Sequence, residues 1–198
     1  MSINLNDDSY NAKEGKAIFN DGNAGLVNNV VVSISKKKPE DKENAPDYKL
    51  TFTDENGAEA NTSFWYVTKA TPFATTEELL KKQGTIMKHI LHSIYGAGYV
   101  IPALPSDAQG FLDGCMKLIR DGLQSGLKFR VFANYGTPDY PKSFIQPRSW
   151  VPFMEPMSVA EADTRLVAGK ADNLVRLASD PVGGSSSAPA ATITDDWD

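Results

Sequence analysis

Apolar and polar residues alternate through much of the first third of the chain, which is the pattern of half-buried β-strands. Residues 25–35 hold four valines and an isoleucine and predict a first strand, which ends at the polar loop that begins with Lys36. Residues 48–53 alternate strictly, and the turn residues at 54–57 lead into a strand over 61–68. The first third of the chain therefore predicts two or three strands, of which the last two form a hairpin.

The spacing of apolar residues then changes to the three-and-four pattern of helices. Thr75 and Glu78 match a capping box, and apolar residues recur at helical spacing after them until Gly96 ends the helix. A second capping-box pattern, Ser106 with Gln109, precedes the apolar face of another helix. Two helices are therefore expected to follow the first strands.

Strict alternation returns over residues 127–135 and predicts another strand. The turn residues at 136–139 then reverse the chain, so that residues 143–151 can return as the partner strand. This part of the sequence predicts a second hairpin.

A third capping-box pattern, Ser158 with Glu161, predicts a C-terminal helix through Leu177. From Pro181 onward the chain is rich in Gly, Ser, Ala and Pro, which predicts a flexible tail. The predicted fold is α+β, mainly β with helices, an OB-like small antiparallel barrel; an open α+β sheet is the alternative. The predicted organisation is an OB-like domain over residues 1–180, a helical insertion over 75–124 within it, and a linker and acidic tail over 181–198.

The composition fits one globular domain, because 41% of the 198 residues are hydrophobic and 23% are charged. The sequence has no run of about 20 apolar residues, so it predicts no membrane span. The single cysteine, Cys115, cannot form an internal disulfide, and with two histidines it leaves too few soft ligands for a structural zinc site. We therefore expect a protein of the reducing cytoplasm that uses no cofactor.

The formal net charge of −5 argues at first against nucleic acid, because nucleic-acid binders carry a basic footprint. The distribution of the charges changes this picture. Three acidic residues lie within the last four positions, whereas residues 127–150 hold four basic residues against Asp139 alone. A locally basic pair of strands is therefore expected inside a mildly acidic protein.

Side chains of the strand over residues 127–135 alternate between two sides. One side is apolar and is expected to face the core, while Lys128, Arg130 and Phe132 fall on the other. Single-stranded nucleic acid requires cations that hold phosphates and rings that stack on bases for about 1–3 kcal/mol each. The alternative is a solvated strand face with one stray phenylalanine. With the return strand and an earlier tryptophan, the candidate nucleic-acid-binding residues are Lys128, Arg130, Phe132, Tyr135, Tyr140, Lys142, Phe144, Arg148, Trp150 and Trp65.

The chain ends in Asp195, Asp196, Trp197 and Asp198 behind the flexible linker. Trp197 has no apolar neighbours in sequence to pack against, which favours a recognition peptide; a plain solubility tail is the alternative. This ending and the predicted OB-like domain with a helical insertion resemble the single-stranded DNA-binding proteins of bacteria and phages, including those of T7-like phages. Residues 129–156 are similar to the late strands of the phage proteins.

The resemblance implies a protein that coats and protects single-stranded DNA without sequence preference during phage replication, recombination or repair. It places the protein in the cytoplasm of an infected bacterial cell, with a homo-oligomer as a possible state. It also implies that the tail recruits replication proteins, such as a DNA polymerase or helicase, and competes with DNA. The alternative is a virion-associated structural or adaptor protein whose aromatic surface makes protein contacts.

Sequence motifs of catalysis are lacking. His89 and His92 are three residues apart, with no glutamate in a zinc-binding pattern beside them. Cys115 falls on the apolar face of the second predicted helix and is expected in the core. The sequence therefore predicts no enzyme, and a hydrolase or nuclease that uses dispersed carboxylates and a hard metal is the alternative.

Overall fold

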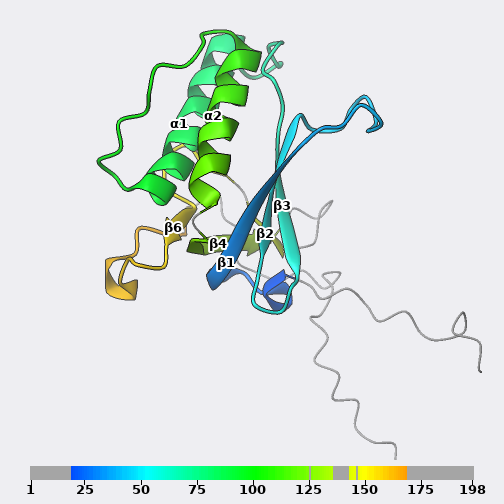
Figure 1. Ribbon diagram of the computed structural model, residues 1–198. Coiled ribbons are helices and arrows are strands. Elements are labelled where there is room, and N and C mark those ends of the chain that lie inside the picture. Colours follow the sequence, from blue (N-terminus) through cyan, green and yellow to red (C-terminus); the bar gives the residue numbers. More distant parts are fainter. Residues whose placement is uncertain (1–18, 125, 136–142, 146, 169–198) are drawn as a thin grey trace, which may run out of the picture.

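The computed structural model describes residues 19–124, 126–135, 143–145 and 147–168. Within these residues the chain forms an antiparallel sheet and two α-helices that pack against it (Figure 1). The predicted α+β class is therefore confirmed.

The sheet consists of six strands, all antiparallel to their neighbours. Their order is β3-β2-β1-β4-β5, and β6 also pairs with β4. Since β1 occupies one edge of β4, both β5 and β6 lie along the other edge. The strands are β1 (Gly25–Lys36), β2 (Tyr48–Thr53), β3 (Glu59–Phe64), β4 (Lys128–Tyr135), β5 (Ser143–Phe144) and β6 (Met154–Pro156).

The long strand β1 is shared between two neighbours. Its second half pairs with β2 and its first half with β4, and Val31 is paired with both. The register shifts between Val27 and Val30, where Asn29 adopts a left-handed backbone conformation with φ of 57°. A bulge of this kind bends a strand and increases its twist. The bulge therefore curves the sheet around the core.

The two ends of the curved sheet, β3 and β5, approach each other without pairing. Among the described residues no ladder of backbone hydrogen bonds joins β3 to β5. One buried side-chain bond spans the gap, in which Thr62 Oγ1 donates to the carbonyl oxygen of Ile145 at 2.7 Å. The predicted closed, OB-like barrel is therefore not confirmed.

The two helices between β3 and β4 are α1 (Thr76–Tyr95) and α2 (Ala108–Leu123). The predicted capping box is present, because Thr75 Oγ1 accepts from the backbone N–H of Glu78 and the Glu78 carboxylate accepts from that of Thr75. In the second helix the N-cap is Asp107 rather than Ser106, as its carboxylate accepts from the N–H of Gly110. No helix in the described part of the chain is long and apolar enough to cross a membrane.

The helices α1 and α2 run parallel. Gly84, in the third turn of α1, faces Phe111 in the first turn of α2, and the Tyr95 hydroxyl at the end of α1 donates to the carbonyl oxygen of Leu118 in the second half of α2 at 2.7 Å. The connection over residues 96–107 therefore returns along the whole length of the pair, as Figure 1 shows. This connection packs against the side of α2 that carries Gly110 and Gly114, where Leu104 lies against Gly114.

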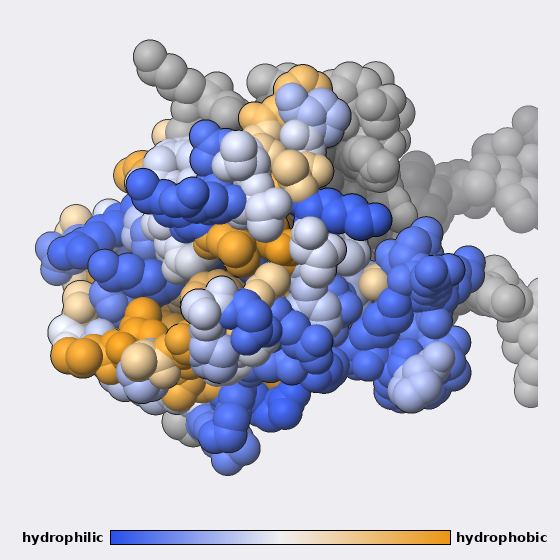
Figure 2. Space-filling model, turned by 90° about the horizontal axis from the view of Figure 1, so that it is seen from above, coloured by the Kyte–Doolittle hydropathy of each residue, from blue (hydrophilic) through white to orange (hydrophobic). Residues whose placement is uncertain are grey.

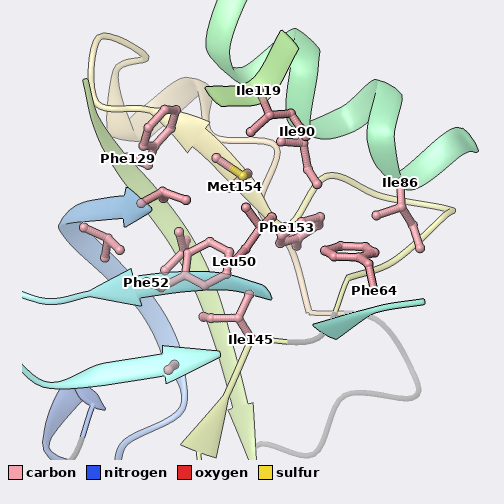
Figure 3. Close-up of a cluster of buried hydrophobic side chains, with 14 of the residues drawn as sticks. Leu50, Phe52, Phe64, Ile86, Ile90, Ile119, Phe129, Ile145, Phe153 and Met154 are labelled. Atoms are coloured by element: carbon pink, nitrogen blue, oxygen red, sulfur yellow. The ribbon is translucent and has the colours of Figure 1, made fainter. Parts of the chain in front are cut away.

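The core fills the space between the helices and the sheet (Figure 3). Ile90 of α1 and Ile119 of α2 point toward the strands, and Leu50 and Phe129 point back from β2 and β4. Phe153, just before β6, lies at the centre of this cluster and is fully buried. Cys115 is buried in the same core, as predicted.

The return strand predicted over residues 143–151 is shorter than expected. Among the described residues of this range only β5 pairs, and the chain rejoins β4 later through β6, which was not predicted. Pro147 and Pro152 lie between these two short strands. Because proline has no backbone N–H for a ladder, they account for the interruption.

The C-terminal helix predicted from Ser158 is wrong within the described residues. Only a single turn of 3-10 helix forms, at Glu161–Asp163, and residues 164–168 have no regular structure. The Glu155 carboxylate accepts from the Thr164 hydroxyl at 2.6 Å and from the Arg165 N–H at 3.2 Å. These bonds to Glu155 hold residues 164 and 165 in a non-helical backbone conformation.

We expect the substitution Gly122→Ala to destabilise the protein by about 1–3 kcal/mol, the usual cost of overpacking. An added Cβ would overlap Ile94 Cγ2 and lie 2.9 Å from the Tyr95 hydroxyl oxygen, which outweighs the higher helix propensity of alanine. Urea unfolding measures the change. The matched control is Gly98→Ala, where no atom lies within 4 Å of the added carbon. Equal stability of the two variants would contradict the close approach of α1 and α2.

Candidate nucleic-acid interface

The outward side of β4 is covered, contrary to the prediction. Arg130 and Phe132 do alternate away from the core-facing residues, but they are only 4% and 5% exposed. The segment that follows β6 lies over them, since Arg130 Nη1 is 3.4 Å from the carbonyl oxygen of Val159 and Leu166 is buried. From Phe129 to Asn134, a strand that the sequence predicts to be half-buried is therefore buried on both sides.

Arg130 is part of a buried ion pair. Its Nη1 donates to Glu155 Oε1 at 2.9 Å, and its Nε donates to Asn28 Oδ1 at 2.8 Å. Glu155 is 6% exposed and lies directly opposite Arg130 in the β4–β6 ladder. The guanidinium therefore joins β4, β1 and β6 inside the protein, where phosphate does not reach it.

Phe132 and Arg148, two further candidates, pack on each other. The guanidinium carbon of Arg148 lies 4.8 Å from the centre of the Phe132 ring, in cation–π geometry. Arg148 Nη1 donates to the carbonyl oxygen of Val167 at 2.9 Å, and only 2% of the residue is exposed. This pair holds the C-terminal segment in place and is not available to a base.

The remaining candidates are placed less closely together than predicted. Lys128 is exposed, and Trp65 and Trp150 are 51% and 59% exposed. Trp150 lies in the segment next to α1, where the Arg148 carbonyl oxygen is 3.2 Å from His89 Nδ1. Outside the described residues or side chains lie Tyr135, Tyr140, Lys142, Phe144 and the tail residues Asp195, Asp196, Trp197 and Asp198.

The exposed surface of the sheet lies instead on β1, β2 and β3, and we call it the outer face. Alternate residues of these strands are buried, so the residues between them point outward. Their register aligns them in three rows across the sheet, and the row that contains Val31 continues to Lys128 of β4. The rows are Val31, Thr53 and Glu59; Ser33, Thr51 and Asn61; and Ser35, Lys49 and Ser63.

Trp65 follows β3 directly and continues its outward alternation. The backbone at this point is held by helix and loop. Gln83 Nε2 of α1 donates to the Trp65 carbonyl oxygen at 3.0 Å, and the Tyr66 N–H donates to Asp47 Oδ2 at 2.7 Å. The indole is therefore exposed on a backbone that is fixed from both sides, at the corner of the outer face opposite Lys128.

Tyr66 points the other way and reaches a carboxylate on α2. Asp113 Oδ1 accepts from the hydroxyls of Tyr66 at 2.8 Å and Tyr48 at 2.7 Å, and Lys36 Nζ lies 3.2 Å from Asp113 Oδ2. Desolvation opposes the charge on Asp113, but these hydrogen bonds outweigh it and lower its pKa. Burial and the bond to Asp113 raise the pKa of Tyr66 to about 12. The ionised Asp113 thus joins α2 to β1, β2 and the segment after β3.

A cavity of about 690 Å³ lies elsewhere, between the C-terminal half of α1 and residues 152–165. Lys88, His89, His92 and Arg165 contribute to its lining. Burial lowers the pKa of His89. No group of three or more His, Cys, Asp or Glu residues that could hold a metal ion occurs in the described part of the chain.

The outer face combines features that suit a flexible, charged, ring-bearing ligand. Its middle row is polar and uncharged, and Thr51 Oγ1 donates to Asn61 Oδ1 at 2.8 Å. Lys49 and Lys128 offer cations, Glu59 is the one acidic member, and Trp65 offers a ring face. Stacking and phosphate contacts require such groups without a specific pattern of base-edge contacts.

Sequence reasoning missed most of this surface. The alternation of residues 48–53 was recognised, but its outward members are small and polar and carry no obvious chemistry. The contacts from Gln83 and Asp47 to the backbone around Trp65 join positions 18 and 19 residues apart, and no local pattern signals them. The sequence signal that could have indicated the outer face is the set of residues that alternate with the apolar ones in a half-buried strand.

Comparison of the chain with protein-family models, with curated proteins and with solved structures finds no match. The chemistry of the outer face is therefore inferred from its residues.

We expect Arg130→Met to cost about 3–5 kcal/mol of stability, because it leaves the buried Glu155 without its partner. Lys128→Met is the matched control: it removes an exposed cation two residues away and should change stability by less than about 0.5 kcal/mol. Urea unfolding of both variants tests this. A stable Arg130→Met protein would show that the guanidinium does not hold the fold.

The Asp113 cluster predicts a pH dependence of stability. A carboxyl whose pKa is lowered on folding stabilises the protein above its unfolded pKa of about 3.9, and this contribution disappears as pH falls through the folded pKa. The difference in Tm between the wild type and Asp113→Asn should therefore shrink from about pH 5 to about pH 2. Thermal unfolding followed by circular dichroism measures it. A difference that stays constant over this range would exclude the ionised carboxylate as the cause.

Proposed function

We propose that this protein binds single-stranded DNA without sequence preference through the outer face and Trp65. The observation that carries the proposal is the half-exposed indole of Trp65 on a fixed backbone, beside a strand face that no described segment covers. Exposing a large aromatic ring is unfavourable in water, whereas stacking on a base gains about 1–3 kcal/mol. Lys49 and Lys128 would hold phosphates on either side of the polar middle row.

The strand arrangement supports a finer proposal, namely that the fold is of the OB type. The long, bulged β1 takes part in both halves of the sheet, and the helices are inserted between β3 and β4. The bond from Thr62 to Ile145 joins the two ends that a barrel would close. In OB folds the face of the second and third strands binds oligonucleotides. That face is the part of the outer face that leads to Trp65.

The biological role that we propose is to coat and protect exposed strands during phage replication, recombination or repair in an infected bacterium. The acidic tail would contact a replication protein such as a polymerase or helicase. Its residues lie outside the described part of the chain, so this role depends on their sequence alone.

A second candidate function is a structural or adaptor protein, and two exposed apolar side chains favour it. Phe73, before α1, is 95% exposed, and Val100, between the helices, is 85% exposed. Figure 2 shows hydrophobic patches among mostly hydrophilic side chains on the face seen from above. Exposed apolar patches are typical of protein contacts. Binding that does not depend on salt would favour this function over DNA binding.

Fluorescence anisotropy of a labelled oligo-dT, titrated with protein at two salt concentrations, tests the DNA proposal. We expect binding that weakens with salt, and a loss of roughly 5- to 100-fold in affinity for Trp65→Ala, from the lost stacking. Duplex DNA is the ligand control. Phe73→Ala is the protein control, because it removes an exposed ring in the loop before α1.

The two variants separate the proposals. Equal loss of affinity in Trp65→Ala and Phe73→Ala would place the contact away from the outer face. No binding of oligo-dT by the wild type at low salt would reject the DNA proposal altogether and leave the adaptor function.

A further inference from the structure

Gln83 is a polar residue on the buried side of α1. It is 8% exposed and one turn before Ile86 and Met87, which belong to the core. Its Nε2 donates to the Trp65 carbonyl oxygen at 3.0 Å. Its Oε1 is buried and has no hydrogen-bond partner among the described residues.

A buried amide whose oxygen has no hydrogen-bond partner lowers the stability of the fold. The unpaired carbonyl loses its hydration and gains nothing in return, while an apolar side chain of similar size would fill the same space without that cost. A glutamine at this position is therefore better explained by what its N–H group does. It holds the carbonyl of the exposed Trp65 next to the outer face.

The restraint acts on the backbone from which the indole projects. Asp47 accepts from the N–H of the following residue, Tyr66, and the Tyr66 hydroxyl is anchored on Asp113. Gln83 supplies the contact to the Trp65 carbonyl from a helix, which is a rigid support. With the carbonyl fixed, the backbone of Trp65 is ordered before a ligand arrives.

We propose that Gln83 is a positioning residue that orders the backbone of Trp65 in advance, so that a base stacks on the indole without the entropy cost of ordering that segment. The inference rests on the proposed function, because it concerns the same ligand. Ordering a backbone segment on binding lowers affinity, and a pre-ordered segment avoids that loss. Removing the contact should therefore loosen Trp65 and weaken DNA binding while leaving the fold intact.

The variant that tests this is Gln83→Met, which keeps the size of the side chain and removes the amide. The substitutions Trp150→Phe and Trp197→Phe remove the other two of the three tryptophans. In this background, time-resolved fluorescence anisotropy reports the motion of the Trp65 indole alone. We expect a larger amplitude of nanosecond motion without DNA. In the otherwise unchanged protein we expect affinity for oligo-dT to fall roughly two- to tenfold, with a Tm equal to or above that of the wild type.

Gln109→Met is the matched control, since it makes the same exchange at an exposed position of α2. Should Gln83→Met fail to fold, Gln83→Asn, which keeps the amide but is one methylene shorter, gives the same test. Unchanged Trp65 motion in the Gln83 variant, relative to the Gln109 control, overturns the inference.

The two readouts also separate this inference from the proposed function. Increased Trp65 motion in Gln83→Met, with no oligo-dT binding by the wild type, would support the positioning role and reject DNA as the ligand. Oligo-dT binding that is as tight in Gln83→Met as in the wild type, with unchanged motion, would reject the positioning role and keep DNA binding.

Discussion

The buried ion pair between Arg130 and Glu155 determines which part of the outward side of the sheet remains exposed. Taking both charges out of water is costly, and the pair is tolerated because Asn28, Thr164 and the Arg165 backbone satisfy the remaining groups. These bonds fasten the segment after β6 across β4. The outer face on β1 to β3 is consequently the exposed sheet surface in the described part of the chain.

The local elements of the fold were predictable, because their signals are local. The Thr75–Glu78 capping box and the alternation in β2 and β4 all depend on residues a few positions apart. The path after residue 145 was not predictable, because Glu155 binds a side-chain group nine residues later and a backbone group ten residues later. Such tertiary hydrogen bonds overrode the helical pattern that begins at Ser158.

The candidate site was predicted in part, for a related reason. The pleat gave the correct direction for Arg130 and Phe132, but direction does not reveal which segment lies on top. Trp65 was among the predicted candidates, and it lies on the outward side of its strand, as the alternation of β3 requires. The amide of Gln83 could not be identified, since a glutamine on an apolar helix face has no pattern that indicates its partner.

The double pairing of β1 has a consequence for how the chain is made. Its partner β2 follows after the loop over residues 37–47, but Leu26 pairs with Phe132, more than a hundred positions later. On a ribosome, the β1–β2–β3 meander can form early. The first half of β1 then has an unpaired edge until β4 is synthesised. An unpaired edge is a template for other strands. During synthesis, the bulge with its polar residues Asn28 and Asn29 interrupts this unpaired edge. A strand of another chain therefore cannot pair along it without a break.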